Sequence, residues 1–171
     1  MLFLQKDYIL NKPKYLYKSE RKYRHFSFVS EGPKGRITKM VEYSQTGQEN
    51  VYNLGFGDYD SSNQSINDLS ITNNGDSLKV LATVASTVYV FLEKYPDCWI
   101  FATGSSQART RLYRMGITNN LVEIEESFKV FALSVDTNEW EVFTVGKDYE
   151  AFFNPPAGAR CAVRTSLDVR N

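Results

Sequence analysis

The sequence is poor in the residues that usually hold metal ions or cross-link a fold. Among 171 residues there is one histidine, His25, and there are two cysteines, Cys98 and Cys161. The cysteines form no CxxC pair and no histidine lies near either of them in the sequence. This argues against a zinc site and against a disulfide framework. We expect no metal site, because Asp58 and Asp60 are explained more simply by turn formation.

Long hydrophobic runs are also missing. The longest apolar-rich stretch, residues 80–92, is interrupted by hydroxyl side chains and is too short to span a bilayer. The amino-terminal segment MLFLQKDYIL is broken by Lys6 and Asp7, so it lacks the apolar run of a signal peptide. We therefore expect a cytoplasmic protein with no membrane partner.

The chain has no excess charge of either sign, but its charges are unevenly distributed. Twenty Lys and Arg balance 20 Asp and Glu. Residues 1–40 nevertheless carry ten basic and three acidic residues, whereas residues 121–150 carry two basic and eight acidic ones. A basic region of this kind can attract polyanions even when the net charge is zero.

Within the basic region, the segment KPKYLYKSERKYRHF interleaves six cations with tyrosines. We favour an edge strand that its lysines protect against aggregation. The alternative is a nucleic-acid surface, in which cations contact the phosphates and rings stack on bases. The residues of that alternative are Lys14, Lys18, Arg21, Lys22 and Arg24.

What the sequence does contain is a composition typical of a folded, strand-rich protein. Hydrophobic residues make up 42% and aromatic residues 14% of the chain. The length fits one domain, which we place at residues 1–153, followed by a loose tail at 154–171. The predicted class is α/β (α+β), with a single mixed, largely antiparallel sheet, the order βββ-α-β-α-ββ and two main helices.

The first half of this order is predicted from the spacing of hydrophobic residues, which changes from strand-like alternation to helical spacing along the chain. Residues 23–44 alternate around the turn EGPKG and predict a hairpin, and residues 51–56 predict a third strand. A polar stretch follows, with a short strand expected at 69–72. Residues 77–95 predict the main helix, capped by Asp76. Its expected core positions are Leu78, Leu81, Val84, Ala85, Val88 and Leu92.

The second half begins with a short apolar run, residues 98–103, which predicts a buried strand. Residues 106–116 predict a second helix that stops at Gly116, with Ala108, Leu112 and Met115 on its apolar face. A second hairpin is expected from residues 128–135 and 139–145, with Trp140, Val142 and Phe143 reaching the core.

Two glycine-bearing turns precede the predicted helices, at residues 72–77 and 103–106. If the preceding strands are parallel and adjacent, both helix N-termini open into one crevice. Unpaired N–H groups and the helix dipoles favour an anion there. The candidate ligand-binding residues are Asn74, Gly75, Asp76, Ser77, Gly104, Ser105, Ser106, Arg109 and Arg111.

Arg109 is unusual because it falls in the first turn of the second helix, where the dipole disfavours a cation by about 0.3–1 kcal/mol. A bound anion would remove that conflict. The alternative interpretation is that Ser105 or Ser106 caps the helix while the arginines reach acidic loops or water.

The strings NVYNLGFGD, TNNGDSLKVLATV and GSSQARTRLYRMGI resemble those of a family of small, uncharacterised bacterial cytoplasmic proteins. The order of elements is similar to the core of the N-acetyltransferase superfamily. That similarity implies a pyrophosphate loop at residues 73–78, matched through Gly75 and Ser77, and makes Tyr113 the candidate catalytic acid.

The function that these patterns favour is binding of a phosphate-bearing small ligand, of nucleotide or coenzyme A type, at the two helix N-termini. An acyltransferase-like activity with a coenzyme A thioester is one form of this hypothesis. The alternative is a non-catalytic component of a bacterial stress, toxin–antitoxin or phage-conflict system, which binds nucleic acid or a partner protein through its basic N-terminal strands.

Overall fold

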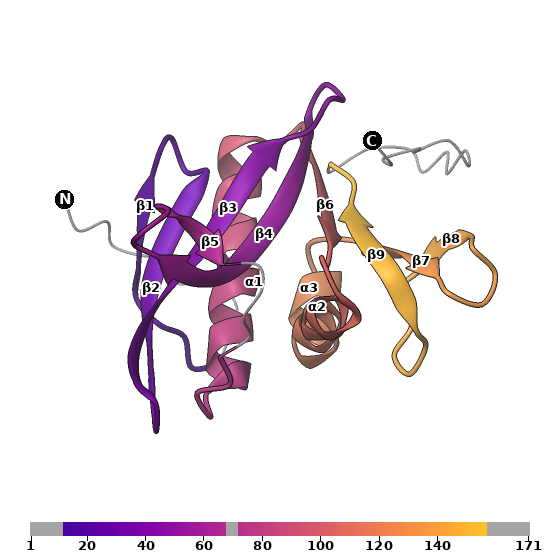
Figure 1. Ribbon diagram of the computed structural model, residues 1–171. Helices are drawn as coiled ribbons and strands as arrows, with labels where there is room; N and C mark the ends of the chain where they lie inside the picture. Colours follow the sequence, from indigo (N-terminus) through magenta and orange to yellow (C-terminus); the bar gives the residue numbers. More distant parts are fainter. Residues whose placement is uncertain (1–11, 68–71, 157–171) are drawn as a thin grey trace.

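The structure, a computed structural model, describes residues 12–67 and 72–156, which form one mixed sheet and three helices (Figure 1). The first strands are β1 (Tyr17–Glu20), β2 (His25–Gly32), β3 (Gly35–Gln45), β4 (Val51–Asp60) and β5 (Ser65–Asn67). The later strands are β6 (Trp99–Thr103), β7 (Phe131–Ser134), β8 (Trp140–Val142) and β9 (Tyr149–Asn154). The helices are α1 (Ser77–Lys94), α2 (Gln107–Asn119) and α3 (Leu121–Glu125).

The nine-stranded sheet has the order β1-β2-β3-β4-β6-β9-β7-β8, with β5 paired to β4 outside this path. Each strand pairing is antiparallel except that of β4 with β6. This confirms the predicted fold class. The connection from β4 through α1 to β6 is the kind of crossover that a parallel pair requires.

Strands β1 to β4 place alternate side chains on the face that α1 covers. Phe26 and Phe28 on β2, and Val41 and Tyr43 on β3, are buried on that face. The Tyr43 ring stacks on Phe91 of α1 with centroids 4.1 Å apart. The basic segment supplies β1. Among the described strands β1 pairs with β2 alone and lies at the edge of the sheet, so the prediction of an edge strand is confirmed for residues 17–20.

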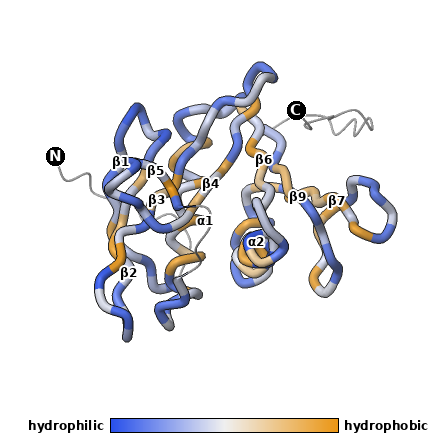
Figure 2. Tube along the Cα trace, in the orientation of Figure 1, coloured by the Kyte–Doolittle hydropathy of each residue, from blue (hydrophilic) through white to orange (hydrophobic). Residues whose placement is uncertain are grey.

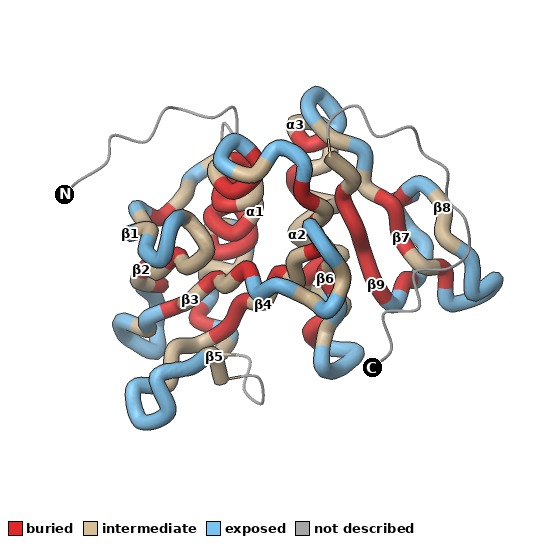
Figure 3. The backbone as a smooth tube through the Cα atoms, turned by 90° about the horizontal axis from the view of Figure 1, so that it is seen from above, coloured by how far each residue is buried: buried red, intermediate tan, exposed pale blue. Residues whose placement is uncertain are grey.

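The other half of the sheet buries aromatic side chains on both faces. Tyr113 of α2 packs against Phe56 on the face covered by the helices. On the opposite face Phe153 of β9 stacks on Phe131 of β7 at 4.9 Å and meets the Trp140 ring at 4.8 Å. Figure 3 shows one run of buried residues along β9 and another along α1, with α2 and β6 between them.

Several element boundaries differ from the sequence predictions. β4 continues to Asp60 and pairs with β5, in a stretch predicted to be loop. Thr72 belongs to no strand, and the rest of the strand predicted at 69–72 lies outside the described residues. Strand β9 and helix α3 were not predicted.

Helix α2 does not stop at Gly116 but runs on to Asn119. The missing side chain lets this turn approach α1, since a β-carbon at Gly116 would lie 3.3 Å from Leu81 Cδ2. The helix ends instead where Asn120 donates its side-chain Nδ2–H to the Gly116 carbonyl at 2.7 Å. Packing against α1 therefore outweighs the low helix propensity of glycine.

Three residues predicted to be in the core are exposed. Leu78 is 64% exposed and Val142 is 53% exposed, and Ala108 also lies on the surface. Leu78 and Ala108 each lie in the first turn of a helix. Figure 2 shows that the turns joining the strands are mostly hydrophilic, while hydrophobic stretches lie within helices and strands. None of the helices within the described residues is long and apolar enough to cross a membrane.

Candidate functional site

A cleft of about 520 Å³ lies where the N-terminal turns of α1 and α2 meet the sheet. Residues from both helix starts line it, together with parts of β3 and β4 and the segment before α1. The lining from the helix starts is Asp76, Ser77, Val80, Leu81, Gln107, Ala108, Arg109, Arg111 and Leu112. The sequence analysis expected both helix starts to open into one crevice if the preceding strands are parallel and adjacent. β4 and β6 are adjacent and parallel, whereas β5, the strand directly before α1, is antiparallel to β4.

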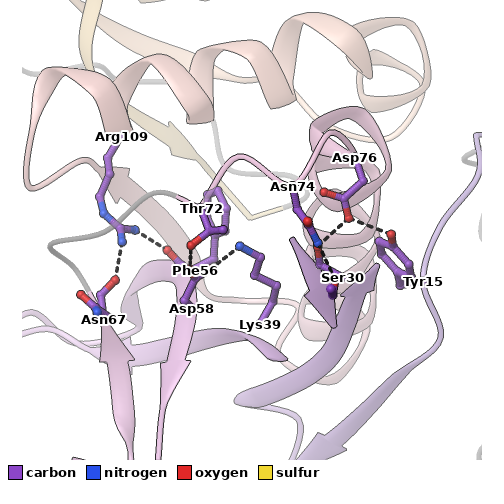
Figure 4. Close-up of polar contacts among 11 residues, drawn as sticks. Tyr15, Ser30, Lys39, Phe56, Asp58, Asn67, Thr72, Asn74, Asp76 and Arg109 are labelled. Carbon is purple, nitrogen blue, oxygen red and sulfur yellow. Dashed lines mark hydrogen bonds and ion pairs between the residues drawn. The ribbon is translucent and has the colours of Figure 1, made fainter. Parts of the chain in front are cut away.

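The floor of the cleft carries a buried ion pair that the sequence analysis missed. Lys39 of β3 lies opposite Asp58 of β4 in the register, and its ammonium contacts the Asp58 carboxylate (Figure 4). The Thr72 hydroxyl donates to the same carboxylate. Lys39 is only 6% exposed. A signal was present, because Lys39 alternates with Val41 and Tyr43 and so occupies a core position of the strand.

Asn74 and Asp76 join the start of α1 to the β2–β3 hairpin (Figure 4). The Asn74 amide donates to Ser30 Oγ at 3.1 Å and to the Gly35 carbonyl at 3.0 Å, and Asn74 is 1% exposed. The Asp76 carboxylate accepts from Ser30 Oγ at 2.6 Å and from the Tyr15 hydroxyl at 2.7 Å. Both side chains therefore hold the cleft wall in place.

Asp76 occupies the N-cap position of α1, but its side chain makes no capping hydrogen bond, so that part of the prediction is wrong. The reason is that its carboxylate is occupied by Tyr15 and Ser30. Burial is the main cause that raises the pKa of the Tyr15 hydroxyl, and the bond to Asp76 adds to it. Gly75, just before the cap, is exposed and has a φ of 78°, a conformation that favours glycine.

The start of α2 follows the predicted capping alternative. Ser106 Oγ accepts a hydrogen bond from the Arg109 backbone N–H at 3.3 Å. Gly104 permits this turn, because a β-carbon there would lie 2.3 Å from the Thr110 nitrogen. Ser105 is exposed and lies outside the cleft lining.

Arg109 joins α2 to β4 and β5. Its guanidinium donates to the Phe56 carbonyl at 2.5 Å and to the Asn67 carbonyl at 2.6 Å, and the residue is 5% exposed (Figure 4). These carbonyl oxygens offset the unfavourable position of a cation at a helix start. Arg111 is exposed at the cleft. Arg114 instead contacts Asp148.

Tyr113, the candidate acid, lies away from the cleft. It is 7% exposed, and its hydroxyl donates to the Leu54 carbonyl at 2.9 Å. Its ring lines a second, apolar cavity on the inner side of α2. The hydroxyl therefore has a structural contact inside the core.

Asp58 and Asp60, the two acidic residues considered as metal ligands in the sequence, have different partners in the structure. The Asp60 carboxylate accepts from the Ser62 backbone N–H at 2.8 Å and from the Asn63 side chain at 2.9 Å, as expected for a turn, and these bonds hold the pKa of Asp60 below its usual value. Asp58 instead belongs to the ion pair with Lys39, so turn formation does not explain it. Across residues 12–67 and 72–156, no three His, Cys, Asp or Glu side chains are grouped to hold a metal ion.

Of the basic residues of the alternative site, Arg21, Lys22 and Arg24 lie in the β1–β2 turn, while Lys18 lies on β1 and Lys14 precedes it. Lys18, Arg21 and Lys22 are exposed, whereas Lys14 and Arg24 are half-buried. The turn has three consecutive residues with positive φ, of 48°, 58° and 63° at residues 21–23. It is held to the end of α1, because the Tyr95 hydroxyl donates to the Lys22 carbonyl at 2.7 Å.

Comparison with known proteins identifies a family but no individual relative. Searches of the curated proteins and of the solved structures find no match. The profile of DUF6934, described as a family of unknown function, matches residues 11–155. That range includes the cleft, the apolar cavity and every strand and helix described above. The chain therefore belongs to the DUF6934 family.

Proposed function

We propose that the cleft between α1 and α2 binds a phosphate-bearing small ligand of nucleotide or coenzyme A type. The observation that carries this proposal is the convergence of the first turns of both helices on one cleft of about 520 Å³. The first N–H groups of a helix have no partners within the helix, and they favour negative charge together with the dipole.

The charges around the cleft support an anion rather than a cation. Lys39, Arg109 and Arg111 line it, against the two carboxylates of Asp58 and Asp76. Both carboxylates already accept hydrogen bonds from protein groups. Arg111 is the exposed cation among these residues, and it supplies a direct contact to phosphate oxygens.

A coenzyme A thioester is one ligand within this class, with its pyrophosphate against the turn that contains Gly75 and Ser77. This version of the proposal is motivated by the similarity between the order of elements in this chain and that in the N-acetyltransferase superfamily. No reaction is assigned, because the Tyr113 hydroxyl is bonded within the core and lies outside the cleft lining.

The test is calorimetric titration with pyrophosphate, ATP and coenzyme A at low salt. Arg111→Gln should weaken binding of the best of these ligands by about tenfold, because one charge-assisted hydrogen bond is lost. Arg114→Gln is the matched control, since it removes an equal charge from the same helix outside the cleft. Equal effects of the two variants would show that only overall charge matters, and no binding of any of the three ligands would overturn the proposal.

A second function, nucleic-acid binding near the β1–β2 turn, is favoured by the exposure of Arg21 and Lys22 in this turn and of Lys18 on the adjoining strand β1. Neutralising these three cations should reduce RNA or DNA retention and flatten its salt dependence. Retention by the variant that equals the native protein's at every salt concentration would exclude this surface.

A further inference from the structure

The apolar cavity on the inner side of α2 is separate from the cleft and measures about 100 Å³. The three helices cover it, and β4, β6 and β9 form its base. Its wall is almost wholly hydrophobic: Val84, Ala85, Val88, Ile100, Ala102, Ile117, Ile124 and Phe152 belong to it. Phe56 and Leu81 line both the cavity and the cleft, and so stand between them.

Among the described lining residues, Asn154 contributes an amide side chain to this apolar wall. It is the last residue of β9 and pairs with Ile100 of β6. Because side chains alternate along a strand, Asn154 lies on the same face as Phe152, which faces the helices and lines the cavity. The register and the lining residues agree that the amide lies against the cavity.

Within the part of the chain that the structure describes, the Asn154 amide has no hydrogen-bond partner. The residue is 8% exposed, and among the described residues neither its Oδ1 nor its Nδ2 is hydrogen-bonded. A buried amide without partners destabilises a fold, and nearly all such groups in proteins are satisfied. The other polar groups of the wall are engaged, since the Tyr113 hydroxyl donates to the Leu54 carbonyl and the Tyr89 hydroxyl to the Glu123 carbonyl.

We propose that this cavity binds a small, mainly apolar molecule whose amide-type edge pairs with the side chain of Asn154. An asparagine amide offers one acceptor and two donors, so its best partner presents a donor beside an acceptor. The apolar walls receive the remainder of the ligand. This proposal does not rest on phosphate binding in the cleft.

The size of the cavity limits the ligand. An engineered apolar cavity of about 150 Å³ holds benzene, and the cavity beside Asn154 is about 100 Å³. The ligand is therefore no larger than a five- or six-membered ring. A single water is small enough for the cavity, but a buried water usually makes about three hydrogen bonds. The unbonded Asn154 amide offers it two, one at Oδ1 and one at Nδ2.

The test uses 2-pyrrolidinone, a five-membered lactam whose N–H and C=O lie side by side, and cyclopentane, which has the same ring without them. Titration is followed by the methyl NMR signals of Ile100, Ile117 and Ile124. In the native protein we expect saturable shifts with 2-pyrrolidinone at millimolar concentration and at least tenfold weaker binding of cyclopentane.

Two variants separate the amide from the cavity. Asn154→Leu should weaken 2-pyrrolidinone at least tenfold and remove the preference over cyclopentane. Ala85→Leu should fill the cavity from α1 and abolish binding of both probes while Asn154 is retained. Because Ala85 belongs to another element, one variant remains informative if the other does not fold. The proposal is overturned if the native protein binds neither probe, or if Asn154→Leu binds 2-pyrrolidinone as well as the native protein does. Whether pyrophosphate binds in the cleft does not affect this test, because the cleft and the cavity are separate sites.

Discussion

Gly104 and Gly47 differ in how much space is available for an added β-carbon. At Gly104 the added carbon would lie 2.3 Å from the Thr110 nitrogen and 2.7 Å from the Ser106 carbonyl, whereas at Gly47 nothing lies within 4 Å. We predict that Gly104→Ala lowers the free energy of unfolding by about 2–3 kcal/mol, because helix backbone must move. Urea denaturation measures this, with Gly47→Ala as the control. Equal stability of the two variants would show that the start of α2 is not packed as described.

Lys39 and Asp58 allow a second test at the scale of residues, because both charges are largely buried. Lys39→Met leaves a carboxylate without its cation and should cost about 3 kcal/mol or more of stability. The double variant Lys39→Met with Asp58→Leu removes both charges and should regain most of that loss. A double variant that is as unstable as the sum of the two single variants would contradict a direct pairing.

At the scale of elements, Arg109 holds the short strand β5 through the Asn67 carbonyl and β4 through the Phe56 carbonyl. β5 has only three residues, so this contact is a large part of its support. We predict that Arg109→Met speeds amide hydrogen exchange in residues 65–67 by tenfold or more, since a charge-assisted hydrogen bond contributes about 1.5–3 kcal/mol. Exchange in β2 serves as the internal control. Unchanged exchange in β5 would show that the hydrogen bond from Arg109 does not hold this strand in place.

The long elements could be predicted from the sequence because their period is repeated many times. Eighteen residues define α1, and eleven define β3. β9 could not be predicted in this way, because residues 151–154 are all buried and show no alternation. Strand β5 and helix α3, of three and five residues, are too short to show a period.

The candidate site was partly predictable for the same reason. The glycine turns identified both helix starts, whereas the parallel pairing of β4 with β6 was only a condition of the expected crevice and was not itself predicted. The roles of Arg109, Asn74 and Asp76 could not be predicted, because their hydrogen-bond partners lie 39 to 61 residues away along the chain and meet them only in the folded sheet. The pairing of Lys39 with Asp58 depends on the same register.

At the scale of the whole molecule, buried tyrosines make stability sensitive to alkaline pH. Burial raises the pKa of Tyr89 to about 12, with Glu123 adding to the effect, and burial also raises the pKa of the fully buried Tyr43. In the unfolded chain tyrosine titrates near 10. The folded state therefore holds these protons longer, and its stability is complete below pH 10 and falls as the pH rises toward 12 and beyond.

Each such tyrosine should contribute a slope of about 1.4 kcal/mol per pH unit in that range. Tyr43→Phe should reduce the slope of stability against pH by about one tyrosine's contribution, and Tyr59→Phe, at a half-buried tyrosine on the same sheet, provides a comparison. Urea midpoints between pH 9 and 11.5, read by far-UV circular dichroism, check this. The same slope in Tyr43→Phe and the native protein would contradict the burial of that hydroxyl.

The central claim is that the two helix starts form one anion site, and an NMR titration with pyrophosphate tests it most directly. We predict saturable shifts of the backbone amides at residues 77–80 and 107–110, with one common dissociation constant that rises about tenfold in Arg111→Gln but not in Arg114→Gln. Shifts confined to residues 18–24, or no saturable shift at either helix start, would contradict the claim.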